Sequence, residues 1–219
     1  MRTEITKLLM KLKEEIEKIE DVDEKIDTIN EIKINLHEVS PISDPVDCVI
    51  WVPANKVQAN EYNPNKVANP EMKLLYQSIK LDGYTMPIVT YKLENEAREV
   101  VDGFHRNRIV KEHNDIAERT FGRLPVSTIN KPLDERMGST IRHNRARGTH
   151  QIRNMSDIVL ELTKYGWSDQ EICKKLGMEL DEVIRLKQIT GLKEAFANHE
   201  FSKSWEEYEQ RRKEFYAET

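Results

Sequence analysis

The feature that most constrains this chain is a strand-like segment that stops at a glycine and restarts as a basic helix. Residues 99–101 are rich in valine, Gly103 interrupts the segment, and the sequence Phe-His-Arg-Asn-Arg follows. Such a turn directs several backbone N–H groups at one point, where the helix N-terminus adds positive potential. Histidine and arginine side chains add donors for phosphate oxygens. The sequence therefore predicts a phosphate-binding turn at Gly103, His105 and Arg106.

A second basic segment follows about forty residues later, at 139–150. It reads Ser-Thr-Ile-Arg-His-Asn-Arg-Ala-Arg-Gly-Thr-His, in which Gly148 can end one helix and the threonine after it can cap the next. One interpretation is a basic, solvated helix face. The other is a second phosphate cradle, and its candidate residues are Asn144, Arg145, Arg147, Thr149 and His150.

Charge is sorted along the chain. The net charge is −5, but residues 1–47 hold 7 Lys and Arg against 13 Asp and Glu, a net of −6 that leaves +1 for the remainder. The overall acidity therefore does not exclude nucleic acid as a partner. No apolar run has the length of a membrane span, and the N-terminus leads straight into a charged helix, so we expect no secretory signal, no membrane partner and a cytoplasmic protein.

The N-terminal segment, 1–40, is predicted to be an acidic helical arm. Apolar residues recur at spacings of three and four over 3–38, and Asp21 can cap a second helix. The pattern fits one long helix or a helical hairpin. It also leaves two roles open: a helix packed on its own domain, or an arm that forms a homodimer or binds a partner protein through residues 1–38.

The remainder alternates strands and helices before becoming wholly helical. Strands are predicted at 48–53, 86–91, 99–101 and 124–129, with helices at 69–82 and 104–116. We therefore expect an α+β fold: a small α/β domain over 46–131, a helical domain over 132–192 and a C-terminal helix over 193–219. A helix-turn-helix is predicted near 167–183, where Ser168 caps the first helix and Gly177 makes the turn.

The order of these elements resembles the ParB N-terminal family, which shares its fold with sulfiredoxin. The residues that carry the resemblance are the Asn-rich loop at 60–65, Gly103-Phe104-His105-Arg106, and Asn144-Arg145-Ala146-Arg147. The resemblance implies a nucleoside triphosphate, CTP or ATP, with or without Mg²⁺. It also implies that the phosphates lie between the two basic segments.

Two residues of this chain differ from the family pattern, and each removes one function that the resemblance would otherwise imply. His143 stands where the family usually has a glutamate, which removes a carboxylate suited to Mg²⁺, so no metal site is predicted. Phe104 stands where sulfiredoxin has its cysteine, which excludes that enzyme's sulfur chemistry. The catalytic candidates that remain are Glu61, as a base, and Asp102, which is more readily interpreted as a cap of the turn.

DNA contact through the helix-turn-helix is predicted at Lys174, Lys175, Arg185 and Lys187. Acidic residues at 179, 181 and 182 open the second helix, where such motifs meet base edges, and they disfavour specific reading of DNA. We therefore expect a ParB-like nucleotide-binding protein that regulates or binds DNA through a nucleotide-gated rearrangement, in a partition, transcription or mobile-element accessory role. The alternative is an enzyme of the same fold: an NTPase, a kinase or a nuclease.

Overall fold

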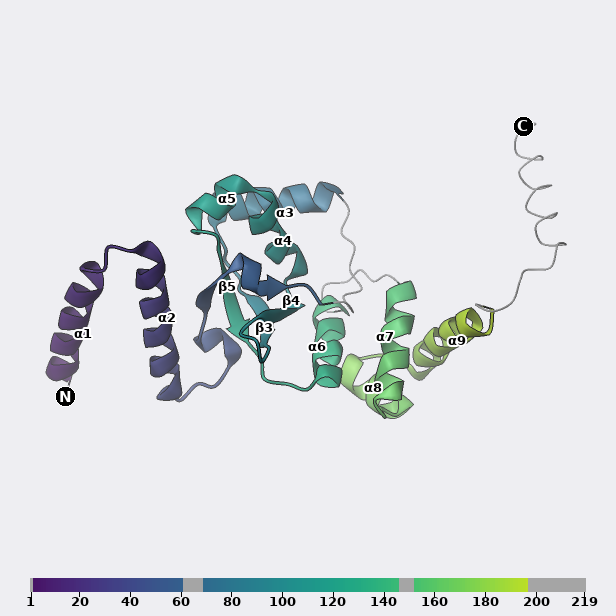
Figure 1. Cartoon of the computed structure of the whole chain (residues 1–219). Helices are drawn as coiled ribbons and strands as arrows, with labels where there is room; N and C mark the ends of the chain where they lie inside the picture. Colours follow the sequence, from purple (N-terminus) through teal and green to yellow (C-terminus); the bar gives the residue numbers. More distant parts are fainter. Residues whose placement is uncertain (1, 61–68, 146–151, 197–219) are drawn as a thin grey trace, which may run out of the picture. The chain divides into compact units, whose positions relative to one another are not determined.

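The structure is a computed structural model that describes residues 2–60, 69–145 and 152–196. The chain divides between residues 150 and 151 into two compact units (Figure 1). The division puts helix α6 (Leu133–Arg145) with the sheet, whereas the sequence boundary at 131/132 assigns it to the helical domain. The reason is that α6 packs on strand β4 (Arg98–Asp102), a contact that helical periodicity alone does not reveal.

The first unit is built around a five-stranded mixed sheet. Its strands are β1 (Ile50–Pro53), β2 (Val57–Gln58), β3 (Ile88–Lys92), β4 and β5 (Arg123–Thr128), in the order β1-β5-β3-β4-β2. Strand β3 runs antiparallel to β4 and parallel to β5, and β1 runs antiparallel to β5. The α+β class predicted from the sequence is confirmed. The two-residue strand β2 was not predicted because it is too short to show alternation.

Helices α3 (Asn69–Asp82), α4 (Phe104–Glu112) and α5 (Asn114–Arg119) complete the core of this unit. The predicted helix 104–116 is in fact two helices that meet at His113, whose extended backbone separates them. Ile88, Ile109 and Leu124 are fully buried where the helices cover the sheet. Burial of these branched side chains supplies the main stabilising free energy of the unit.

The N-terminal segment is a helical hairpin of α1 (Arg2–Glu17) and α2 (Val22–Glu38), one of the two alternatives predicted. The side chain of Asp21 accepts a hydrogen bond from the Glu24 N–H and caps α2, as predicted. Helix α2 packs on β1, while α1 leaves its apolar residues exposed, among them Leu8 and Leu9.

Helix α2 closes the open edge of the sheet with one asparagine. Asn30 donates to the Trp51 carbonyl at 2.7 Å and accepts from the Trp51 N–H at 2.9 Å, so its amide takes the place of a neighbouring strand. Pro125 lies opposite Trp51 and has no N–H. The backbone groups of Trp51 therefore face α2 and find both partners in Asn30, which protects the edge from pairing with another chain.

Ion pairs at the end of β5 strengthen this contact. Arg123 is buried and pairs with the carboxylates of Asp23, at 2.7 Å, and Asp27, both on α2. The hydrogen bond from Arg123 holds the pKa of Asp27 below its ordinary value. These contacts show α2 packed on its own domain. The exposed face of α1 leaves the partner role open for that helix alone.

The second unit contains α7 (Ile152–Lys164), α8 (Asp169–Leu176) and α9 (Leu180–Phe196). Ser168 and Glu171 form a capping box at the start of α8, and Gly177 ends that helix with φ +65°. Leu176, Val183 and Leu186 are buried, as the sequence predicts. The predicted helix-turn-helix is therefore present. No described helix in either unit has the length and apolar character needed to cross a membrane.

We expect Asn30→Ala to lower the free energy of unfolding by about 1–3 kcal/mol, because it leaves the Trp51 N–H without its partner and leaves the Trp51 carbonyl with only the 3.3 Å hydrogen bond from Arg123. Urea denaturation followed by circular dichroism measures the change. The control is Asn35→Ala, on an exposed part of the same helix, whose side chain donates only to the Glu31 carbonyl. Equal effects of the two substitutions would show that Asn30 is not the contact that closes the sheet edge.

Candidate anion-binding turn

The turn between β4 and α4 depends on the backbone conformation of Gly103. Its φ is +95°, in the left-handed region that side chains with a Cβ rarely adopt. A Cβ built at this position would lie 2.9 Å from Nη2 of Arg106 and 3.2 Å from Cγ1 of Ile88. Glycine is therefore required twice: for the turn itself, and for the guanidinium group that packs directly against it.

Arg106 folds back over this turn to reach Asp102. Its Nη2 lies 3.3 Å from Oδ2 of Asp102, and the two side chains are only 14% and 6% exposed. The hydroxyl of Tyr84 donates to the Arg106 carbonyl at 2.9 Å, and burial raises the pKa of that hydroxyl to about 12, so it stays protonated as a donor. Asp102 and Tyr84 thus fix both ends of the arginine at the N-terminus of α4.

Helix α6 contains the described start of the second basic segment, residues 139–145, and packs on β4. Arg136 donates to Oε1 of Glu99 at 3.0 Å, and one turn later the hydroxyl of Thr140 donates to the Val101 carbonyl at 2.9 Å. Four residues of an α-helix rise about 6 Å along the helix axis, which is close to the rise of two residues along a β-strand. Helix α6 therefore runs alongside β4 in the same direction.

A further turn of the same match would bring the backbone of Asn144 level with Gly103. The contact of Arg136 with the face of Tyr91, 3.8 Å from the ring centroid, holds α6 on the sheet in addition to the hydrogen bonds. The pairing of the two basic segments stays a prediction. The side chains of Asn144 and Arg145 lie outside the described residues.

The other predicted site residues divide into two groups. Asp102, Gly103, His105 and Arg106 come together at the turn, where the ring of His105 meets Phe104 edge-on at 5.3 Å. Residues outside the described part of the chain are Glu61, Arg147, Thr149 and His150. Asp102, expected to cap the turn or act in catalysis, accepts from Arg106, which fits a positioning role.

Sequence reasoning missed two buried amides near this turn. Asn60 is 6% exposed and its Nδ2 donates to the Val100 carbonyl at 2.7 Å, while Asn107, in the first turn of α4, is 2% exposed. An asparagine usually indicates a loop or cap, and nothing in the sequence marks these two as buried. The only indication in the sequence is their position. Asn60 begins the Asn-rich loop, and Asn107 lies inside the basic segment that follows Gly103.

The predicted DNA-binding residues of the second unit are not equivalent. Lys174 and Arg185 are exposed on α8 and α9. Lys175 lies over the ring of Trp167, 4.0 Å from its centroid, and Lys187 pairs with Asp169. Two of the four predicted contacts are therefore engaged within the unit, and Lys174 and Arg185 are the better candidates for phosphate contact.

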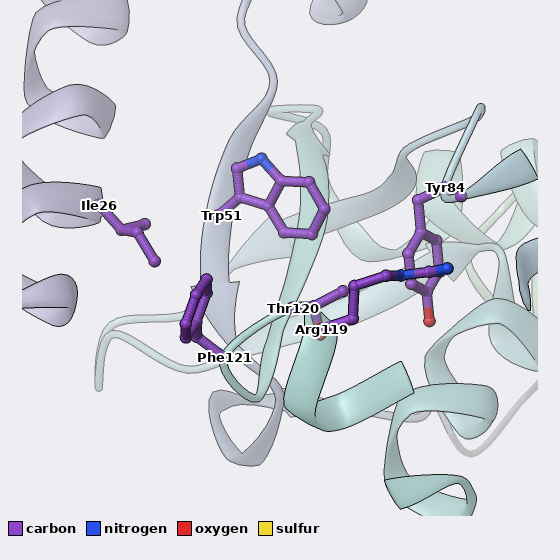
Figure 2. A pocket seen from close by; sticks show the side chains of 7 residues that line it. Ile26, Trp51, Tyr84, Arg119, Thr120 and Phe121 are labelled. Carbon is purple, nitrogen blue, oxygen red and sulfur yellow. The ribbon is translucent and has the colours of Figure 1, made fainter. Parts of the chain in front are cut away.

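A separate cavity of about 420 Å³ lies in the first unit, away from Gly103 (Figure 2). Trp51, Tyr84 and Phe121 form aromatic walls, and Ile26 of α2 closes one side. Arg119 also borders it, but its guanidinium donates to two carbonyls at the end of α3. The cavity thus offers apolar walls and suits an apolar group better than a phosphate.

Fold and site together define an α+β protein with a helix-turn-helix unit. Residues 150–198 match the family model of the IbrB-like C-terminal HTH domain. The chain is 51% identical over 184 residues to the uncharacterized protein YbdM of Escherichia coli strain K12, and the match covers 84% of this chain and 88% of that protein. The chain therefore belongs to the YbdM family.

Solved structures that align with the chain include ParB proteins. ParB from Caulobacter crescentus complexed with CTP-gamma-S aligns with a TM-score of 0.38 and 18% identity, over 65% of this chain and 78% of that chain. The same protein complexed to the centromeric parS site aligns with a TM-score of 0.42 and 17% identity, over 62% and 68%. ParB proteins are thus among its structural matches, as the motif resemblance predicts. At these TM-scores no residue of this chain inherits a role from them.

We expect Gly103→Ala to destabilise the first unit more than Gly83→Ala does. Both positions have positive φ, +95° and +79°, so both substitutions introduce backbone strain of about 1–3 kcal/mol. Nothing lies within 4 Å of a Cβ at Gly83, whereas at Gly103 the new methyl group displaces Arg106. Urea denaturation of the two variants separates the strain from the clash. Equal losses would show that the guanidinium does not depend on the missing side chain.

Proposed function

We propose that this chain is a ParB-like protein that binds the phosphates of a nucleoside triphosphate, CTP or ATP, at the Gly103 turn. The observation that carries the proposal is the parallel course of α6 and β4, through the Glu99–Arg136 and Val101–Thr140 contacts. It directs the start of the second basic segment, in α6, along the strand that ends at the Gly103 turn. Backbone N–H groups at the start of α4 and the guanidinium of Arg106 then face one anion.

The residues at the turn fit a phosphate group. Gly103 has no side chain to cap the first turn of α4, and the left-handed backbone lets a ligand approach closely. Asp102 fixes Arg106 by one nitrogen, which orients the flat guanidinium before a ligand arrives. Among the described residues no group of three acidic, histidine or cysteine side chains is placed to hold a metal, so we propose phosphate binding by the protein's own donors.

The nucleotide would act as a gate between the two units. Residues 146–151 join α6 to α7, and they include the predicted phosphate ligands Arg147, Thr149 and His150. A ligand held by Gly103 and by this connection restrains the helix-turn-helix that follows it. Binding then shifts the population of arrangements of the second unit, by as much as the ligand's affinities for them differ. In this proposal the second unit is the part that contacts DNA.

Removing the guanidinium tests the phosphate site. We expect Arg106→Ala to weaken nucleotide binding by about tenfold or more, because a charge-assisted hydrogen bond contributes about 1.5–3 kcal/mol. Isothermal titration calorimetry with CTP and ATP, with and without Mg²⁺, measures the affinity. Arg108→Ala is the matched control, since Arg108 lies on the same helix and pairs with Glu112 at 2.7 Å. Unchanged affinity in Arg106→Ala would remove this residue from the phosphate site.

Salt dependence tests the role of the second unit. We expect the double variant Lys174→Ala, Arg185→Ala to bind duplex DNA more weakly, with a salt slope that is smaller by about 1 for each phosphate it no longer neutralises. Fluorescence anisotropy at several salt concentrations measures the slope. The control is Lys164→Ala, on α7, where the ammonium pairs with Glu161 at 2.9 Å. A slope near zero in the unsubstituted protein would leave the helix-turn-helix as a scaffold.

The exposed apolar face of α1 favours a homodimer formed through the hairpin. Ile5, Leu8 and Leu9 are 52%, 62% and 55% exposed on one side of the helix. Helices with such a face commonly pack against a second helix. A partner protein at the same surface is the alternative, and the mass of the protein in solution distinguishes the two.

A further inference from the structure

Two buried side-chain amides near the Gly103 turn have oxygen atoms without a hydrogen-bond partner among the described residues. They are Oδ1 of Asn60 and Oδ1 of Asn107, in side chains that are 6% and 2% exposed. Buried polar atoms are nearly always paired, and each exception calls for a cause such as a ligand or an ordered water. Two such atoms in one part of the fold indicate a site that the protein's own groups leave incomplete.

Asn60 contacts β4 at Val100, and Asn107 lies in the first turn of the helix that follows this strand. Asn60 donates to Val100, three residues before Gly103, and the Asn107 N–H donates to the Gly103 carbonyl at 3.0 Å. One turn further along α4, Lys111 donates to the Val57 carbonyl of β2 at 2.5 Å. Since residues four apart share a helix face, Asn107 lies on the side of α4 that meets β2, from which the chain continues to Asn60.

The hydrogen bond to Val100 decides what Asn60 offers to a ligand. A carbonyl oxygen only accepts, so the amide nitrogen of Asn60 must face Val100 and the oxygen must face the other way. Asn60 therefore presents an acceptor and selects a donor. No contact among the described residues fixes the side-chain amide of Asn107 in this way, so it can turn either its oxygen or its nitrogen to a ligand. Selectivity for the ligand's hydrogen-bond donor then comes from Asn60, while the side-chain amide of Asn107 can rotate to suit the ligand.

We propose that Asn60 and Asn107 form a nucleobase subsite that takes a base with an exocyclic amine, cytosine or adenine, and rejects uracil or hypoxanthine. The inference rests on the proposed nucleotide function and adds its base selectivity. The Oδ1 atom of Asn60 accepts from the amine. The amide of Asn107 pairs with the edge of the base, as asparagine does with adenine, by accepting from the amine and donating to the ring nitrogen. An oxo group at the amine position places two acceptor oxygens opposite each other.

The nucleotides CTP and UTP test the proposal as a pair. Cytosine has an exocyclic amine where uracil has an oxo group, and uracil has a proton on the adjacent ring nitrogen. ATP and ITP form a second such pair. We expect the unsubstituted protein to bind CTP at least tenfold more tightly than UTP, by calorimetry, and ATP more tightly than ITP. In Asn60→Leu the affinity for CTP should fall to that for UTP, while binding of inorganic tripolyphosphate stays unchanged. Asn35→Leu, on an exposed face of α2, should leave all affinities unchanged.

Three results would overturn the inference, and they have different meanings. Equal binding of CTP and UTP by the unsubstituted protein would show that an ordered water completes the two amides. If Asn60→Leu weakens the binding of CTP, UTP and tripolyphosphate equally, Asn60 has a structural role. If Asn60→Leu does not fold, the same comparison in Asn107→Leu provides a second test. Absence of binding by every nucleotide and by tripolyphosphate would remove the proposed function as well.

Discussion

The contact between a guanidinium group and a backbone without a side chain is the constraint on which this site depends. Gly103 leaves room for Arg106 to reach Asp102, with 2.9 Å between Nη2 and the position a Cβ would occupy. The same glycine, at φ +95°, turns the chain from β4 into α4. The end of the strand, the start of the helix and the orientation of the arginine side chain therefore all depend on this glycine. This joint dependence gives the turn the preorganised donors that an anion site needs.

The remainder of the first unit keeps that turn in place from two sides. On one side α6 follows β4 through the contacts of Arg136 and Thr140. At the far edge of the sheet, Asn30 replaces a missing strand and Arg123 ties α2 to β5. The sheet therefore has a closed edge, and a rigid sheet suits the positioning of a ligand at the end of one of its strands.

The sequence predicted the elements better than their contacts. Glycine punctuation and apolar period located β4, the start of α4, and the helix-turn-helix with Ser168 and Gly177, because these signals are local. For the N-terminal segment the same signals left one long helix and a hairpin as alternatives. The break at His113 was not predicted, since the apolar pattern continues across it and only packing on the sheet separates α4 from α5. Strand β2 has two residues, too few to show a period.

The candidate site was predictable to the same extent. The basic turn is visible in the residues themselves, whereas the ion pair of Asp102 with Arg106 and the buried state of Asn60 and Asn107 follow from tertiary packing. Lys175 and Lys187 were predicted to contact DNA because of their charge. In the structure Lys175 lies over the ring of Trp167, and Lys187 pairs with Asp169. Residue type therefore indicated the candidate groups, and only the three-dimensional arrangement showed which of them contact one another.

Hydrogen–deuterium exchange of the turn, with and without inorganic tripolyphosphate, tests the central claim most directly. The amides of Phe104, His105 and Arg106 begin α4, where in the proposed site an anion at the Gly103 turn would accept their hydrogen bonds. We expect tripolyphosphate to slow exchange at these three amides and to leave exchange in β1 and α2 unchanged. Unchanged exchange at the start of α4, at a tripolyphosphate concentration that saturates binding, would contradict the claim.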